Sequence, residues 1–395
     1  MQISDKRKAM AVPAVLRLGF RPFFLLGTLL ALLAVPLWVA ELNGMPLLPT
    51  PVGGWLAWHR HELVFGFAGA IIAGFLLTAV QTWTGQASVS GRALAALVLI
   101  WLLARLTWWM ESSWLLLAFN ALFLLAVATT MGRLLWRVRQ VRNYPTVVLL
   151  LLLCAADVLT LLGVQDGNEA WQRQGTQAAI WLVAGMMSLI GGRVIPFFTQ
   201  RGLSRSAQVK AWPWLDWSLL VGSVLVAVLT VSGFLLDANW LAGLLFAGLS
   251  LGHGIRLVRW FDGGLLRVPL LWSLHIAYAW MVVACVGLAA WHFGAPLVPS
   301  QALHGLTVGA MGGLILAMLA RVSLGHTGRP LQLPRAFALA FVLLNLAAVA
   351  RVFGVSLVYQ PALWLAAAGW VLAFLQFVIC YGPMLCRTRV DGHPG

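Results

Sequence analysis

The chain has 395 residues, of which 61% are hydrophobic and only 9% are charged. Soluble domains carry about a quarter charged residues, so this composition excludes a string of soluble domains and predicts an integral membrane protein. Roughly twelve spans of about 20 residues would use about 240 residues and leave only short connections. We therefore expect a single integral-membrane domain over residues 1–395, without a separate aqueous domain.

Twelve apolar runs of spanning length follow one another along the chain. They cover residues 18–40, 63–82, 93–109, 114–135, 147–164, 178–198, 215–235, 241–258, 269–291, 302–320, 336–353 and 362–385. The predicted fold class is all-α, a polytopic membrane bundle of about 12 transmembrane helices.

The formal net charge is +15, and the basic residues are distributed unevenly between the two sides of the predicted membrane. The two tails and every second connection hold all of the 26 Lys and Arg residues except Arg60, Arg105, Arg173 and Arg351. Short basic loops remain in the cytoplasm, so both termini are predicted to face the cytoplasm of a bacterial inner membrane. Membrane lipid, and not nucleic acid, is the expected partner of this charge.

The chain start and the cysteines exclude two further classes. A basic stretch is followed by a run of spanning length, which favours a first membrane anchor over a cleaved signal peptide. Cys154, Cys285, Cys380 and Cys386 show no CxxC or CxxCH spacing. A disulfide scaffold, a zinc ribbon and covalently attached haem are therefore not expected.

Small residues recur in the second, sixth and tenth predicted helices. The series are Gly66, Gly69, Gly74; Gly185, Ser188, Gly191; and Gly305, Gly309, Gly312. A turn containing Gly and Thr is expected after each helix, at residues 82–85, 191–199 and 325–330. Small residues allow close approach of backbones or of a flat cofactor. Two interpretations stay open: tight helix packing, or three four-helix arcs whose glycine-bearing helices line cofactor or substrate spaces.

Histidines supply the candidate chemistry, because ionisable groups inside a membrane are costly and usually mark sites. On the outer side, His59, His61 and His304 are expected at one depth. On the inner side, His253 and His275 flank a short loop, and His326 is expected in the turn after the tenth helix. Neutral imidazole ligates both haem iron and copper, so the residue types permit either.

The preferred haem ligand pair is His61 with His304, with Gly69 two turns from His61 leaving room beside the ring. On one regular helix His59 and His61 would point about 200° apart. Either His59 lies in the preceding loop and turns inward, or the two histidines serve different partners.

Other polar groups near these histidines have alternative roles. Glu62 either orients an imidazole or is an acid favoured at a helix N-terminus. Asp157, midway through the fifth helix, is either a proton-relay group or a neutral packing group. Arginines at the helix ends either hold haem propionates or another anion, or anchor the topology. They are Arg60 and Arg105 on the outer side, and Arg193, Arg321 and Arg329 on the inner side.

Several strings resemble the NnrS family, membrane proteins that contain haem and copper and are linked to nitric-oxide stress. They are LGFRPFF at 18–24, WHRHE at 58–62, GFLLTA at 74–79 with WTG at 83–85, GGRVIPFFT at 191–199, LH at 274–275, and the stretch from His304 to GHTGRP at 325–330. The resemblance implies non-covalent haem b and copper as cofactors. It also implies that haem or copper ligands are found among His59, His61, His275, His304 and His326.

A looser similarity connects the expected architecture with haem-copper oxidase catalytic subunits, which hold haem between helices 2 and 10 of three four-helix arcs. His61 and His304 would occupy these two helices. The sixth predicted helix has no histidine, so a three-histidine copper centre of the oxidase type is not expected.

The function predicted first is a haem- and copper-binding inner-membrane protein that handles nitric oxide or its iron adducts, with or without turnover. Two histidine ligands on one iron favour electron transfer, whereas one leaves a position for nitric oxide. The alternative is a proton- or metal-coupled transporter without haem, in which Asp157 and the glycine-bearing helices form the path. A third possibility is a sensor or assembly factor.

Overall fold

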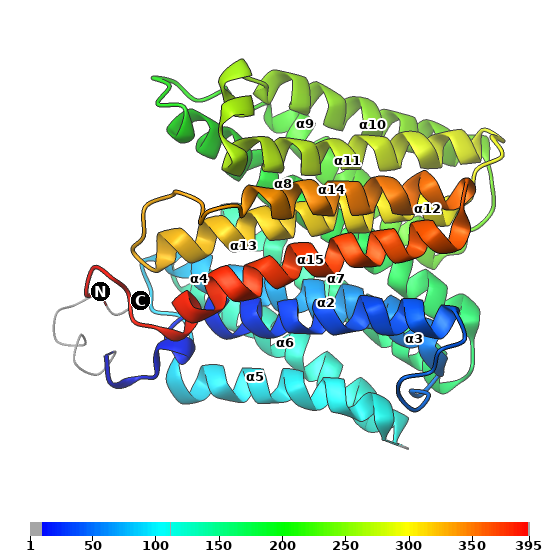
Figure 1. Ribbon diagram of the computed structural model, residues 1–395, viewed down its shortest axis with the longest axis horizontal. Coiled ribbons are helices and arrows are strands. Elements are labelled where there is room, and N and C mark those ends of the chain that lie inside the picture. Colours follow the sequence, from blue (N-terminus) through cyan, green and yellow to red (C-terminus); the bar gives the residue numbers. More distant parts are fainter. Residues whose placement is uncertain (1–9, 111, 394–395) are drawn as a thin grey trace. The chain divides into compact units, whose positions relative to one another are not determined.

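The computed structural model describes residues 10–110 and 112–393. Every regular element in these residues is a helix (Figure 1), which confirms the all-α prediction. Within this part of the chain, 12 helices are long and apolar enough to cross a membrane, so the protein is a multi-pass membrane protein. The basic residues Lys6, Arg7 and Lys8 of the predicted cytoplasmic N-terminus lie outside the described residues.

The chain forms two compact units. Unit 1 comprises Met1–Ala179, Leu319–Pro334 and Phe374–Gly395, and unit 2 comprises Ile180–Met318 and Arg335–Ala373. Three long helices contribute to both units: α8 (Glu169–Gly202), α13 (Gly313–His326) and α15 (Tyr359–Cys386). The predictions of one domain over residues 1–395 and of three four-helix arcs stay predictions.

Unit 1 holds the first five spans. Its helices are α2 (Phe20–Leu42), α3 (Gly54–His61), η3 (Glu62–Ala68), α4 (Gly69–Thr84), α5 (Gly91–Leu106), η4 (Thr107–Trp109), α6 (Ser113–Arg137) and α7 (Tyr144–Gln165). Helix α2 packs against α4, and α6 packs against both α5 and α7. The ends of α13 and α15 complete the unit.

Unit 2 holds the helices α9 (Pro213–Val231), α10 (Trp240–Trp260), α11 (Pro269–His292), α12 (Pro299–His304), η7 (Gly305–Gly312) and α14 (Ala338–Val352). Helix α11 is central, because it contacts α10, α12 and η7. Trp280 of α11 donates to Asn345 Oδ1 of α14 at 2.9 Å.

Two spans change from α-helix to π-helix along their length. The span Gly54–Thr84 runs through α3, η3 and α4, and the span Pro299–His326 runs through α12, η7 and α13; η3 and η7 are the π segments. Short π segments are rare and occur frequently at functional sites. Each of these two begins directly after a predicted site histidine, His61 or His304.

Several predicted helix ends were wrong because the helices are longer. His59 lies inside α3, so the alternative that places it in a loop is excluded. Residues 191–199, expected as a turn, are helical, because α8 continues past Arg193 and Pro196 to Gly202. Arg321 lies inside α13, which ends at His326 and not before it. Gly and Pro lower the helix propensity of a segment without forbidding the helix, so they alone do not end it.

The small-residue series serves mainly for packing. A Cβ atom at Gly74 would lie 3.0 Å from Phe23 Cβ, and one at Gly309 would lie 2.4 Å from the Trp280 ring. Gly69 differs, since its Cβ would meet only the Val64 carbonyl oxygen, at 3.8 Å, among the described atoms. Tight packing therefore explains Gly66, Gly74, Gly309 and Gly312, whereas Gly69 keeps an open side.

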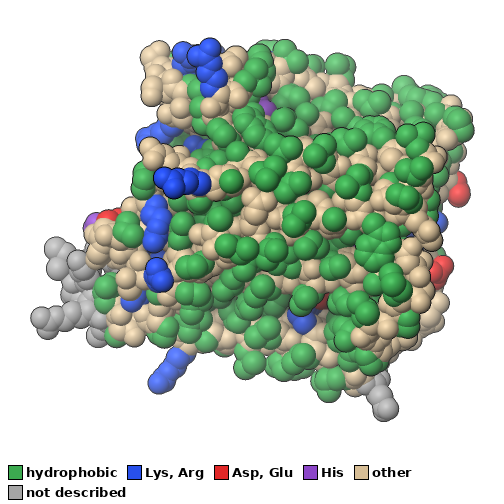
Figure 2. Space-filling view, viewed as in Figure 1, with side chains coloured by type: hydrophobic (Ala, Val, Ile, Leu, Met, Phe, Trp, Pro, Cys, Tyr) green, Lys and Arg blue, Asp and Glu red, His purple; other side chains and the backbone are tan. Residues whose placement is uncertain are grey.

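The outer surface is apolar, as lipid contact requires. Figure 2 shows hydrophobic side chains over most of the helical surface in view. Leu33 is 62% exposed and Val258 is 77% exposed. Such surface would be a liability in water and is ordinary in a bilayer.

Candidate functional site

Unit 1 buries a connected cluster of four ionisable side chains, which we call the charge cluster: His61, Glu62, Arg105 and Asp157. His61 Nδ1 lies 3.0 Å from Glu62 Oε1, and His61 Nε2 lies 2.7 Å from Asp157 Oδ1. Arg105 Nε lies 2.9 Å from Glu62 Oε2. All four side chains are at most 10% exposed. Each charge therefore depends on its neighbours and not on water.

His61 and Glu62 are consecutive residues at the point where the helix changes from α to π. Successive side chains on an α-helix point about 100° apart and do not face each other. His61 is the last residue of α3 and Glu62 is the first of the π segment η3. Their side chains nevertheless meet, with His61 Nδ1 3.0 Å from Glu62 Oε1.

The charge cluster holds one proton more than its separate groups would. Neutral imidazole has one N–H and one lone pair, so it can donate to only one of the two carboxylates that it contacts. A further proton must lie on His61 or on Glu62 or Asp157. With that proton and the charge of Arg105, the net charge of the four groups is zero. Proton transfer through His61 would connect Asp157 with Glu62.

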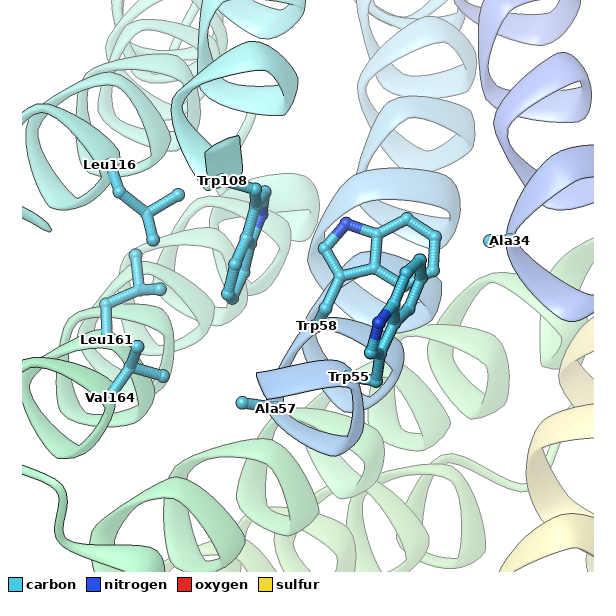
Figure 3. Close-up of a cluster of buried hydrophobic side chains, with 8 residues drawn as sticks. All are labelled: Ala34, Trp55, Ala57, Trp58, Trp108, Leu116, Leu161 and Val164. Carbon is cyan, nitrogen blue, oxygen red and sulfur yellow. The ribbon is translucent and has the colours of Figure 1, made fainter. Parts of the chain in front are cut away.

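Aromatic side chains close one side of the charge cluster. Trp108 Nε1 donates to Glu62 Oε1 at 2.7 Å. Figure 3 shows the Trp108 indole with Leu116, Leu161 and Val164 on one side and Trp58 on the other. The remaining members of this buried group are Ala34, Trp55 and Ala57. These side chains keep water from the carboxylate of Glu62.

Arg105, predicted as a partner of haem propionates, is engaged within the protein. Besides its ion pair with Glu62, its guanidinium donates a hydrogen bond to Asn120 Oδ1 on α6 and lies 5.4 Å from the Trp101 ring. Asn120 therefore forms a bond between two helices. Its contact with Arg105 was not foreseen, because its spacing from Arg105 in the sequence carries no signal.

His59 and Arg60 lie on other faces of α3. The His59 ring stacks on Trp38, with centroids 4.8 Å apart. The charges that act on Arg60 belong to Glu169 and Arg173. The prediction that His59 and His61 point in different directions is confirmed.

In unit 2, His304 presents a different state of the imidazole. Its Nδ1 lies 2.6 Å from the Ser300 carbonyl oxygen, which can only accept, so Nδ1 carries the proton. A neutral ring then has its lone pair on Nε2. No hydrogen-bond partner of Nε2 is found among residues 10–110 and 112–393.

The positive charge of Arg351 on α14 acts on the ring of His304. Sequence reasoning had named Arg60 and Arg105 as the outer anion partners and had passed over Arg351. Its signal was available, because it is one of only four arginines on the predicted outer side.

His253 belongs to a second buried network, which lies entirely in unit 2. Its Nδ1 lies 2.8 Å from Tyr278 Oη, and Arg256 Nη1 donates to the same oxygen at 3.0 Å. Arg256 also bonds Asp216 and Ser188. His253 Nε2 is buried without a partner in the described residues. The roles of Tyr278 and Arg256 were not predicted.

Glycine makes room for this network. A Cβ atom at Gly192 would lie 2.9 Å from Arg256 Nη2, and one at Gly191 would lie 3.7 Å from the Tyr278 ring. Gly192, which follows the second part of the small-residue series, therefore leaves the space that the Arg256 guanidinium occupies.

The remaining inner-side candidates each have neighbours of their own. His275 faces two carbonyl oxygens, with Nδ1 2.9 Å from Leu271 O and Nε2 3.3 Å from Trp260 O. His326 belongs to unit 1, where its ring lies 5.6 Å from that of Phe20. Arg321 is buried in α13, and Arg329 follows the turn after it.

The predicted metal ligands do not form a multi-ligand site within the described part of the chain. There, no group of three or more His, Cys, Asp or Glu side chains is arranged to hold a metal ion. The pairing of His61 with His304, and any grouping of His326 with His253 and His275, combine residues of different units and stay predictions. Isolated histidines are better suited to bind haem than copper, because haem iron takes only one or two protein ligands.

The helices and the buried polar groups define a polytopic membrane protein with several histidines in buried hydrogen-bonded networks. A family model described as NnrS protein matches residues 14–389, so the chain belongs to the NnrS family. No curated protein matches the chain.

Proposed function

We propose that the protein is a haem-binding protein of the bacterial inner membrane, with cytoplasmic termini, that acts in nitric-oxide metabolism or resistance. His304 would be the axial ligand of the iron. The observation that carries the proposal is the hydrogen bond of His304 Nδ1 to the Ser300 carbonyl, at 2.6 Å. It supports a lone pair on Nε2, which is the form that ligates iron.

The contacts of the two outer histidines favour one axial ligand over two. Both ring nitrogens of His61 are in contact with carboxylates, so ligation by His61 would require one contact to break. His304 meets no such competition. A single ligand leaves an open position on the iron, where nitric oxide binds. Arg351, whose charge acts on His304, is suited to hold a propionate.

Copper is included in the proposal only because the chain belongs to the NnrS family. The described residues provide no group of three ligands, so no residue is assigned to copper.

Absorption spectroscopy and metal analysis of the detergent-purified protein test the proposal. We expect a Soret band that shifts when nitric oxide is added, and iron bound in stoichiometric amount. His304→Ala should lose most of the bound haem while the protein remains folded by circular dichroism.

His292→Ala is the matched control. His292 also lies at the end of a unit 2 helix, but its Nδ1 accepts from the Asn239 backbone at 3.2 Å. This variant should keep its haem. Full haem retention in His304→Ala, or equal loss in both variants, would contradict the assignment.

The charge cluster of unit 1 favours a second candidate, a proton-coupled transporter without haem. A proton shared among His61, Glu62 and Asp157 is what such coupling requires. Reconstituted vesicles with an internal pH indicator would show substrate-dependent proton entry that Asp157→Asn abolishes. A haem-free protein with this activity would support the second candidate over the first.

A further inference from the structure

Two of the sequence motifs meet at one end of unit 1. The LGFRPFF motif begins α2, and the GHTGRP motif ends α13; the chain after α15 lies against both (Figure 1). The Phe20 ring lies 5.6 Å from the His326 ring. Val390 N donates to Thr327 O at 3.2 Å, and Arg389 Nη1 donates to His326 O at 3.1 Å. These contacts surround one arginine, Arg21.

Gly19 allows α2 to approach α4 closely enough to bury Arg21. A Cβ atom at Gly19 would lie 2.8 Å from Leu77 Cβ, and one at Gly74 would lie 3.2 Å from Gly19 O. The Phe20 backbone N–H donates to Thr78 Oγ1 at 3.0 Å. The start of α2 is therefore fixed, and with it the position of the next residue, Arg21.

Arg21 is fully buried and only partly bonded. Its side chain is 0% exposed, and Nη1 donates to the carbonyl oxygens of Leu385 and Arg387 at 2.9 and 2.6 Å. Nε and Nη2 have no hydrogen-bond partner in the described residues. These two atoms form one edge of the guanidinium, which binds the two oxygens of a phosphate or carboxylate side by side.

The surroundings of Arg21 are positively charged. Its strongest electrostatic neighbours are Arg17, Arg389 and Arg329, together with the Cys386 thiol. Arg329 Nη1 is also buried without a hydrogen-bond partner in the residues described. The nearby carboxylate of Asp391 is already held by Arg389, through bonds of 2.9 and 2.5 Å. An anion is needed to balance the remaining charge.

We propose that this cluster of arginines, with Arg21 and Arg329 at its centre, binds the phosphate of an anionic phospholipid. Arg21 is the second residue of the first span, and lipid phosphates lie near the ends of spans. The cluster is at the end that the distribution of Lys and Arg predicts to be cytoplasmic, where basic sites between helices bind anionic headgroups. Leu29 and Leu33, 38% and 62% exposed on the same helix, offer apolar surface for an acyl chain.

The segment that follows α15 packs beside Arg21. Asp391 packs against the turn of α13, since a Cβ atom at Gly328, whose φ is +74°, would lie 2.8 Å from the Asp391 carboxyl. The lipid phosphate binds the Nε and Nη2 edge of Arg21, which this segment leaves free. Asp391 neutralises Arg389, whose charge acts on Arg21, so its removal increases the positive charge around Arg21 and favours the lipid.

Native mass spectrometry of the full-length protein with added phosphatidylglycerol or phosphatidylcholine tests the proposal. We expect one phosphatidylglycerol to bind at least tenfold more tightly than phosphatidylcholine. Arg21→Gln and Arg329→Gln should weaken that first binding about tenfold, as loss of a charge-assisted hydrogen bond predicts. Asp391→Asn should strengthen it. Arg205→Gln, which changes an exposed arginine of unit 2, should leave it unchanged.

Two results would overturn the proposal. One is equal affinity for both lipids in a folded wild-type protein. The other is unchanged phosphatidylglycerol binding in Arg329→Gln, a residue at the rim whose loss the fold tolerates more readily than that of Arg21. Addition of millimolar inorganic phosphate identifies the source of the anion. Displacement of the lipid by phosphate would show a site for free phosphate and contradict the lipid assignment.

Discussion

Arg105→Gln tests how strongly burial increases the cost of an unpaired charge. Arg105 Nε lies 2.9 Å from Glu62 Oε2, and the two side chains are 10% and 1% exposed. Unit charges about 4 Å apart attract by about 1 kcal/mol in water and about 4 kcal/mol at an effective dielectric constant of about 20. Removal of one partner of a buried pair costs about 3–5 kcal/mol. We expect a loss of this size in the free energy of unfolding.

Unfolding of the detergent-purified protein by SDS, followed by tryptophan fluorescence, measures this loss. The exposed pair Arg205–Asp262 is the matched control, because its N–O distance is also 2.9 Å while its side chains are 54% and 29% exposed. Arg205→Gln should leave the unfolding midpoint unchanged. The double variant Arg105→Gln, Glu62→Gln should lose less than the sum of the two single changes. Equal destabilisation by Arg105→Gln and Arg205→Gln would refute the reasoning.

Two further predictions use the same assay. Gly309→Ala places a Cβ atom 2.4 Å from the Trp280 ring and should lower the free energy of unfolding by about 1–3 kcal/mol through overpacking. Gly248→Ala, with no described atom within 4 Å, should be neutral or stabilise the protein by about 0.5–1 kcal/mol. Equal destabilisation by the two variants would contradict the packing argument. Asp157→Asn keeps a hydrogen bond to His61 Nε2, so it should destabilise the protein less than Asp157→Ala. Asp157→Ala leaves a buried ring nitrogen without a partner, which costs about 1–3 kcal/mol of the free energy of unfolding. The reverse order would argue against the observed contact.

The helices could be predicted from the sequence because a bilayer requires each span to have a minimum length and an apolar composition. Both properties can be read from short segments of the sequence. The twelve spans follow from this constraint alone. Helix ends were predicted less well, as α8 shows by continuing through Pro196 to Gly202. Turn-forming residues end helices in water, where solvent takes up the freed backbone groups, but a membrane provides no such partner.

The charge cluster could be predicted only in part. Asp157 was recognised as an unusual carboxyl and Glu62 as a group that could orient an imidazole, but nothing in the sequence connects Asp157 with His61, 96 residues earlier. That contact depends on the rotation of two helices about their axes, and each residue of register changes the direction of a side chain by about 100°. The π segment adds a local change of register that periodicity does not reveal.

The same local backbone change accompanies two histidines in different chemical states. The π segments η3 and η7 follow His61 and His304 directly. At His61, the carboxylate of the next residue lies beside one ring nitrogen, and Asp157 lies beside the other. At His304 the next residue is Gly305, which has no side chain to contact the ring, and among the described residues the bond found goes to the carbonyl of Ser300. The residue that begins each π segment thus decides whether its histidine has a carboxylate as its immediate neighbour in the sequence.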